Sequence, residues 1–257
     1  MSVDRIALVT GANQGVGLEV ATKLAANGVT VYLGSRDPAR GEAAVAGIPT
    51  GATAIQLDVT DLASIAAAAE RIRAEHGRLD LLVSNAGISN TRTGSATPEE
   101  MAASSTASTA SLDEVRAIWD VNVFGVLAVY QAMLPLLRAS SDARIVNVSS
   151  GVGSLASNAD SSFPYRTIYG PGYAASKTAE NAMTLAMMIE LEQTDIKINL
   201  VSPGFTSTAL NNFAGTESVE DGSREVVRVA LLGPDGPTGH LHALGGHHHP
   251  VVAMADG

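Results

Sequence analysis

Short apolar runs alternate with longer segments of helical spacing along most of this 257-residue chain. The runs are almost continuously apolar, which is typical of strands that helices cover on both faces. They span residues 5–10, 29–35, 54–59, 79–86, 143–150 and 197–203. Repeated strand, helix and strand units predict an α/β fold, in which helices flank both faces of a doubly wound parallel sheet of about seven strands.

The segments between these runs carry the residues expected at helix ends. Residues 17–28 place apolar side chains at helical spacing and stop at a glycine, Gly28. Residues 61–77 begin at Asp61, a candidate N-cap, and end at Gly77. We therefore predict a helix over each of these segments.

Two stretches, near residues 89–111 and 154–172, interrupt the alternation. The first is rich in Ser, Thr and Ala, and both are typical of surface loops, which could also frame a substrate mouth. No internal repeat and no linker divides the chain. We therefore expect a single domain over residues 1–257, with these two loops inserted.

Composition limits the partners of this domain. The formal net charge of −10 argues against a general attraction to nucleic acid or to an anionic membrane, which favours a small-molecule enzyme. The absence of cysteine excludes disulfides and thiolate metal sites. The N-terminus lacks a basic region followed by a long apolar run, and no segment approaches the length that spans a bilayer, so we expect a cytoplasmic protein.

A glycine-rich stretch, TGANQGVG, directly follows the first apolar run and precedes a helical segment. Glycines at these positions allow a tight turn and close approach of the backbone to a pyrophosphate, which the helix N-terminus also favours. This Rossmann-type arrangement predicts dinucleotide binding, the alternative being an ordinary strand-to-helix turn. The candidate cofactor residues are Gly11, Asn13, Gln14, Gly15, Val16 and Gly17.

The end of the second run, LGSRDP, places Ser35 and Arg36 where such a site meets the adenine ribose. Sites for NAD commonly have an acidic side chain here, whereas a guanidinium can bind a 2′-phosphate through two hydrogen bonds. The sequence therefore favours NADP(H). In the alternative, Arg36 is a surface arginine and Asp37 contacts the ribose.

The stretch YAASK places Tyr173 one helical turn before Lys177, so the two side chains share a helix face. A free phenol has a pKa of about 10, and a neighbouring ammonium lowers that pKa toward the range useful for proton transfer. In the alternative, the tyrosine simply packs and the lysine is solvated.

Several further motifs, in the same order, resemble the short-chain dehydrogenase/reductase family, in its single-domain branch, over almost the whole chain. They are LDVT with Asp58 and Val59, SNAG with Asn85, Ala86 and Gly87, VNVFG with Asn122, NVSSG with Ser150, and VSPGFTSTAL. Ser84 stands where the family usually has an asparagine. The resemblance implies that LDVT contacts the adenine and that the last motif lies on the nicotinamide side, through Pro203, Gly204, Thr206 and Thr208. Thr208 matches the family threonine better, and a simple turn explains Thr206 equally well.

The resemblance also implies a catalytic group. Tyr173 would donate a proton to a carbonyl oxygen as hydride arrives, and Lys177 would lower the phenol pKa and bind the nicotinamide ribose. Ser150 would hold the carbonyl oxygen, with Ser149 as the alternative. Asn122 would relay protons through a distortion of its helix and a bound water.

The sequences of the motifs are similar to those of NADPH-dependent carbonyl reductases within the family. This implies reversible reduction of a ketone or aldehyde to an alcohol. The alternatives are an NAD-linked alcohol or sugar dehydrogenase and a catalytically silent dinucleotide-binding sensor or scaffold. The interval of 23 positions from Ser150 to Tyr173 is longer than usual, and it leaves open whether the protein is a monomer or a homo-oligomer.

Histidines gather near the C-terminus at positions 240, 242 and 247–249. No carboxylate stands at ligand spacing beside them, so we expect a solvated tail and no metal site.

Overall fold

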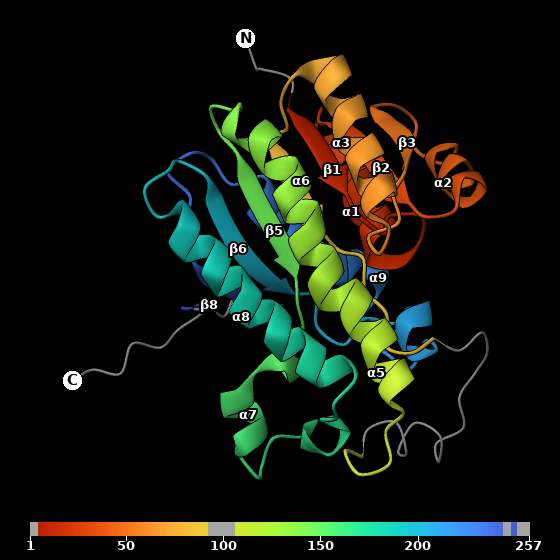
Figure 1. Cartoon of the computed structure of the whole chain (residues 1–257), viewed down its shortest axis with the longest axis vertical. Helices are drawn as coiled ribbons and strands as arrows, with labels where there is room; N and C mark the ends of the chain where they lie inside the picture. Colours follow the sequence, from red (N-terminus) through yellow and green to blue (C-terminus); the bar gives the residue numbers. More distant parts are fainter. Residues whose placement is uncertain (1–4, 92–105, 244–247, 251–257) are drawn as a thin grey trace.

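The computed structural model describes residues 5–91, 106–243 and 248–250. Its centre is one eight-stranded sheet in the order β3-β2-β1-β4-β5-β6-β7-β8 (Figure 1). The first seven strands in this order are parallel, and β8 pairs antiparallel with β7. The predicted doubly wound α/β fold is thus confirmed, with one antiparallel strand added at the edge.

Each of the six apolar runs overlaps a strand. The strands are β1 (Ile6–Val9), β2 (Thr30–Ser35), β3 (Ala52–Gln56), β4 (Leu81–Ser84), β5 (Arg144–Val148), β6 (Lys197–Ser202), β7 (His240–Ala243) and β8 (His248–Pro250). The helices are α1 (Gly15–Ala26), α2 (Pro38–Val45), α3 (Leu62–His76), α5 (Leu112–Trp119), α6 (Val126–Arg138), α7 (Leu155–Ala159), α8 (Tyr173–Leu191) and α9 (Val219–Ala230).

Helices cover both faces of the sheet and divide the core into two apolar layers. The layer under α3, α6 and α8, which lie in front of the sheet in Figure 1, includes Ile72, Met133 and Leu191. The layer on the other face, under α1 and α9, includes Leu24 and Val226. Because both faces are covered, the strands between them are apolar throughout.

Local side-chain chemistry sets the ends of the predicted helices. The Asp61 carboxylate accepts a hydrogen bond from the Ala63 amide at 2.9 Å and caps α3, while Gly77 ends that helix with φ 70°. Helix α1 ends at Ala26, and Gly28 follows with φ 79°. Both helix predictions are confirmed.

The sheet order places β1 between β2 and β4. The crossovers on the two sides of β1 therefore lead in opposite directions, and ligands of open α/β sheets bind beside the carboxyl ends of the strands at such a point. The residues predicted to bind the cofactor follow β1, β2 and β4 and lie at this edge.

Two expectations about these segments need correction. The helical stretch Leu112–Arg138 is 27 residues long and apolar enough to span a membrane, although 56% of its most apolar part is buried inside the protein. The second predicted loop contains a short helix, α7, capped by Ser154. Most of the first predicted loop lies outside the described residues.

The predicted solvated tail is wrong for His242, which lies on β7 and is 1% exposed. Its Nδ1 atom lies 3.6 Å from Glu225 and 3.1 Å from a guanidinium nitrogen of Arg228. His248 and His249 form part of β8, and His247 lies outside the described residues. Within the described ranges, no cluster of His, Asp and Glu has the geometry of a metal site.

Candidate active site

The glycine-rich loop between β1 and α1 packs tightly against the chain that leaves β4. Gly11 has φ 61°, and a Cβ atom at this position would lie 2.7 Å from the Cα of Ala86. A Cβ at Gly17 would lie 2.3 Å from the side-chain nitrogen of Asn85 and 2.8 Å from the Gly11 carbonyl oxygen. Neither position has room for a larger residue, which keeps the backbone of the loop open toward a ligand.

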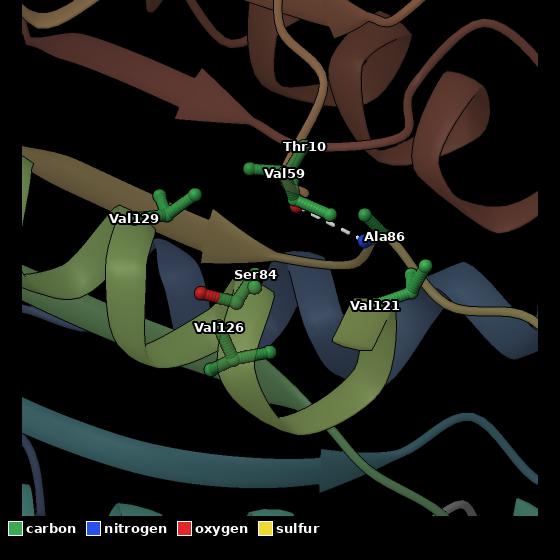
Figure 2. A pocket seen from close by; sticks show the side chains of 8 residues that line it. Thr10, Val59, Ser84, Ala86, Val121, Val126 and Val129 are labelled. Atoms are coloured by element: carbon green, nitrogen blue, oxygen red, sulfur yellow. Dashed lines mark hydrogen bonds between the residues drawn. The ribbon is translucent and has the colours of Figure 1, made fainter. Parts of the chain in front are cut away.

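Hydrogen bonds from Asn85 fix this loop. Its side-chain amide donates to the carbonyl oxygens of Thr10 and Gly11 at 3.0 and 3.1 Å. In return, the Thr10 hydroxyl accepts hydrogen bonds from the backbone amides of Asn85 and Ala86, both at 3.0 Å. Figure 2 shows the bond to Ala86. The SNAG segment therefore acts as a clamp that joins the ends of β1 and β4.

Helix α1 presents its first amides without a side-chain cap. Its N-cap residue, Gln14, is exposed and makes no capping hydrogen bond, and its first turn has no acidic residue. In contrast, Asp37, Asp61 and Ser111 cap α2, α3 and α5 with their side chains. Uncapped N-terminal amides are the groups that bind a phosphate.

Ser84 occupies the end of β4 and is buried, and its hydroxyl has no hydrogen-bond partner among the residues that the structure describes. It lines a narrow crevice with no room for a water molecule. The other lining residues are Thr10, Val59, Ala86, Val121, Gly125, Val126 and Val129 (Figure 2). The shorter side chain, where asparagine is usual, thus leaves a small gap beneath the SNAG clamp.

The end of β2 carries the residues predicted to meet the adenine ribose. Ser35 is buried, and its hydroxyl donates to the Asp37 carbonyl oxygen at 2.7 Å. The Asp37 carboxylate accepts hydrogen bonds from the amides of Ala39 and Arg40 and caps α2. Arg36 is exposed, and among the described residues its side chain has no ion-pair partner. Of the two candidates for binding the ribose, Asp37 already caps a helix, whereas the Arg36 side chain has no ion-pair partner among the described residues.

The adjoining strand end carries the LDVT residues. The Asp58 carboxylate accepts hydrogen bonds from the amide and the hydroxyl of Thr60, at 2.9 and 2.7 Å. Val59 is buried against a π-helical turn, Asp120–Gly125, because a Cβ at Gly125 would lie 2.9 Å from the Val59 side chain. This segment therefore joins the cofactor edge to the helix that carries Asn122.

The segment after β6 bends back over the glycine-rich loop. Pro203 and Gly204 end the strand, and the Thr206 hydroxyl donates to the Pro203 carbonyl oxygen at 2.8 Å, as in a simple turn. Thr208 lies beside the loop, since a Cβ at Gly15 would be 3.5 Å from its methyl group. The structure thus brings Thr208, and not the Thr206 hydroxyl, to the cofactor edge.

Tyr173 is the first residue of α8, and Lys177 follows one turn later. The Lys177 Nζ atom lies 5.9 Å from the centroid of the Tyr173 ring. A Cβ at Gly87 would lie 3.7 Å from this Nζ atom and 3.4 Å from the Asn122 side-chain oxygen. Three separate motifs, SNAG, VNVFG and YAASK, therefore converge on the lysine.

Two acceptors hold the ammonium of Lys177, which is 4% exposed. It donates to the Val148 carbonyl oxygen at 2.9 Å and to Oε2 of Glu180 at 2.6 Å. Burial by itself lowers the pKa of Lys177, but the charges of Glu180 and Tyr173 outweigh burial and hold that pKa above its usual value. Burial also raises the pKa of Glu180, and Lys177 opposes this effect.

Asn122 lies inside a π-helical turn, Asp120–Gly125, between α5 and α6. Its side-chain oxygen accepts from the Ile88 amide at 2.9 Å, and its nitrogen donates to the Ile88 carbonyl oxygen at 2.9 Å and to the Ser176 hydroxyl at 3.0 Å. The helix distortion is therefore present at the position where the resemblance implies it.

The two serines after β5 differ in the hydrogen bonds that their hydroxyls make. The Ser149 hydroxyl is buried and donates to the Asn181 side-chain oxygen at 2.6 Å. The Ser150 hydroxyl is half-buried and has no partner among the described residues. The turn that follows it, Gly151–Gly153, packs on α8, because a Cβ at Gly153 would lie 2.9 Å from the Lys177 backbone. Ser150 is thus the serine that remains available for a ligand.

Sequence reasoning missed three residues of this site: Ser176, Glu180 and Asn181. Glu180 had a signal, because it stands three residues after Lys177 on the same helix face. The Asn122 and Ser149 side chains that contact Ser176 and Asn181 lie on other elements, so spacing along α8 gave no signal for these contacts.

Comparison with known proteins decides the family. Residues 5–218 match the short chain dehydrogenase family. The chain belongs to this family. Among relatives, a short-chain dehydrogenase of Penicillium roqueforti, anuI, is 35% identical over 237 residues, which cover 89% of this chain and 89% of the relative.

Solved structures of related proteins share the fold of this short-chain dehydrogenase. Salutaridine reductase from Papaver somniferum is 29% identical, with a TM-score of 0.78 over 92% of this chain and 99% of its own. NADPH-bound carbonyl reductase from chicken fatty liver is 26% identical, with a TM-score of 0.77 over 95% of this chain and 97% of its own. The protein is therefore an oxidoreductase that acts on small molecules.

The residues of this short-chain dehydrogenase fit a nicotinamide dinucleotide. The narrow contacts of Gly11 and Gly17 and the uncapped amides of α1 suit a pyrophosphate, while the Lys177 ammonium retains a third N–H for a ribose hydroxyl. The residues therefore suit the pyrophosphate and one ribose of such a cofactor.

Proposed function

We propose that this short-chain dehydrogenase uses NADPH to reduce a ketone or an aldehyde to an alcohol. The observation that carries the proposal is the Tyr173 hydroxyl. Among the described residues it has no hydrogen-bond partner, and its ring lies beside the buried ammonium of Lys177. A proton donor that no protein group occupies is what a carbonyl substrate requires.

The protein residues share the work of the reaction. Bound NADPH supplies a hydride to the carbonyl carbon. Tyr173 passes its hydroxyl proton to the carbonyl oxygen, while the Ser150 hydroxyl holds that oxygen in place. Lys177 keeps a positive charge near the phenolate that forms, and Asn122 supports the path by which the phenolate regains a proton. In the reverse direction, the phenolate accepts the alcohol proton.

Preference for NADPH over NADH is supported at the end of β2. The Asp37 carboxylate is engaged in capping α2, whereas Arg36 is exposed and free to bind a 2′-phosphate. The relative from chicken liver is described as NADPH-bound, which agrees with this preference.

The decisive experiment is a screen of aromatic, aliphatic and keto-ester carbonyls for oxidation of NADPH, repeated with NADH. We expect turnover of at least one substrate class and a higher kcat/KM with NADPH. A clear preference for NADH would favour an NAD-linked alcohol or sugar dehydrogenase. Tight NADPH binding without turnover of any carbonyl or alcohol would favour a catalytically silent sensor.

A further inference from the structure

The site holds a buried carboxylate that the proposed reaction does not use. Glu180 lies on α8 and is 1% exposed, and its Oε2 atom is 2.6 Å from the Lys177 Nζ atom. Its second oxygen, Oε1, is also buried and has no hydrogen-bond partner in the part of the chain that the structure describes. Charged carboxylates are rarely buried unless a specific partner holds them there, and here that partner is the lysine of the catalytic group.

We propose that Glu180 is a positioning residue, the buried counter-ion that keeps Lys177 protonated and holds its ammonium beside Tyr173. This inference rests on the proposed function, because it gives the ammonium a task in proton transfer. It also makes a separate statement about the lysine itself, which does not depend on turnover.

The hydrogen bonds of Lys177 support the positioning role. An ammonium has three N–H donors. One donates to the Val148 carbonyl oxygen on β5 and another to Glu180 on the next turn of α8. Two fixed acceptors determine the direction of the third donor, which is left for the ligand side of the site.

The charge of Lys177 also depends on Glu180. Burial disfavours a charged ammonium, and a lysine buried without a counter-ion can lose its proton near neutral pH. Burial is the largest influence on the pKa of Lys177, and the Glu180 carboxylate is the largest influence that opposes it. Without this carboxylate, the pKa of Lys177 would fall.

Few other charges reach the pair. Among the described residues, Lys177 is the titratable group that acts on Glu180, while Glu180 and Tyr173 act on Lys177. The neighbours from other elements are neutral: the Val148 carbonyl on β5 and the Asn122 amide in the π-helical turn. A change in the charge of Glu180 is therefore felt mainly by Lys177 and, through it, by Tyr173.

A purely structural role explains the carboxylate less well. Buried ion pairs often stabilise a fold no more than apolar residues of similar volume. Further along the same helix, Met187 and Leu191 are buried in the apolar core. Apolar residues at both positions, 177 and 180, could fill the space without the cost of burying two charges.

The test is the pH profile of kcat/KM for carbonyl reduction in Glu180→Gln, which removes the charge but keeps the size. We expect the alkaline limb to move to lower pH by about one unit or more. The shift has this sign in both possible cases. If Lys177 stays charged, the unopposed ammonium makes the Tyr173 proton more acidic, and if Lys177 deprotonates, the ammonium itself is lost.

Two control variants accompany this test. Glu180→Asp keeps the charge and should restore the position of the limb, even at a reduced rate. Glu190→Gln makes the same change on α8 at an exposed site, where the carboxylate contacts Arg138 and Tyr130, and should leave the profile unchanged. An equal loss of rate by Glu180→Gln at every pH would overturn the proposal and leave only a structural role.

Thermal unfolding tests the counter-ion role without any substrate. In the wild type, the raised pKa of Lys177 gives stability that persists up to the unfolded pKa of about 10.4 and is lost above it. In Glu180→Gln, the lowered pKa of Lys177 makes the free energy of unfolding rise with pH. The Tm deficit of the variant should therefore shrink between about pH 8 and pH 10.

A Tm deficit that is constant over this range would overturn the counter-ion role. A shrinking deficit in a protein that reduces no carbonyl would instead refute the proposed function and retain the role of Glu180 toward Lys177. The two proposals therefore fail in distinguishable ways.

Discussion

The Nζ atom of Lys177 lies 5.9 Å from the centroid of the Tyr173 ring, within the range of a cation–π contact. The lysine is held by Val148 and Glu180, so the tyrosine is not needed to satisfy it. The Tyr173 hydroxyl correspondingly lacks a partner among the described residues. This division of contacts leaves the phenol hydroxyl available for a ligand.

The two adjacent serines should respond differently to removal of their hydroxyls. We expect Ser150→Ala to lower kcat/KM for carbonyl reduction by about 10²-fold or more, because the carbonyl oxygen loses a hydrogen-bond donor. We expect Ser149→Ala to keep most of the activity and to cost about 1 kcal/mol of unfolding free energy, through the lost bond to Asn181. Steady-state kinetics and urea unfolding measure both effects. The opposite pattern would assign the catalytic role to Ser149.

Arg36 should determine the choice of coenzyme. Hydrogen bonds to charged groups contribute about 1.5–3 kcal/mol, so Arg36→Ala should weaken NADPH binding by about 10-fold to 100-fold and leave NADH binding nearly unchanged. Fluorescence titration measures both affinities. Arg73→Ala is the matched control, because Arg73 is exposed on α3 and pairs with Glu70. Equal effects of Arg36→Ala on the two coenzymes would contradict a role in binding the 2′-phosphate.

Gly17 should tolerate no side chain. The added Cβ of Gly17→Ala would meet Asn85 at 2.3 Å and the Gly11 carbonyl oxygen at 2.8 Å. We expect a loss of about 1–3 kcal/mol in unfolding free energy together with weaker NADPH binding. Gly47→Ala is the control, because its Cβ would make only ordinary contact, at 3.5 Å from the Ala44 carbonyl oxygen. If Gly17→Ala kept wild-type stability and NADPH affinity, the SNAG segment would have to move aside at little cost, which would contradict this prediction.

The strands and helix ends could be predicted because their causes are local. The continuous apolar runs mark strands that are covered on both faces, and Asp61 and Gly77 set the ends of α3 through their own side chain or backbone. The bounds shift by a few residues, as in β3, which ends at Gln56 and leaves Asp58 and Val59 in the loop that follows.

The misplaced features depend on pairing between distant segments. The sequence predicts a solvated tail around His242 because no carboxylate stands at ligand spacing there. In the structure β7 pairs with β6, and contacts with Glu225 and Arg228 on α9 satisfy the imidazole. The β8 strand exists only through its pairing with β7. No local pattern in a histidine-rich stretch reports such pairing.

Within the candidate site, the sequence located the motifs but not all of their contacts. The π-helical turn at Asn122 follows from the family resemblance and not from residue propensities. Glu180 is a case where the usual rule misleads, because a glutamate on a long helix is expected in solvent. Its burial depends on the position of Lys177 relative to β5, which is a tertiary relationship. The roles of the individual residues remain predictions.

The most direct test of the account is Tyr173→Phe, measured for NADPH binding and for reduction of a carbonyl that the wild type accepts. The variant keeps the ring beside Lys177 and removes only the hydroxyl, so NADPH affinity should stay within a few-fold of the wild type. The kcat for reduction should fall by about 10²-fold to 10⁴-fold, because the proton donor is lost. An unchanged rate of reduction in Tyr173→Phe would contradict the assignment of Tyr173 as the proton donor and the mechanism built on it.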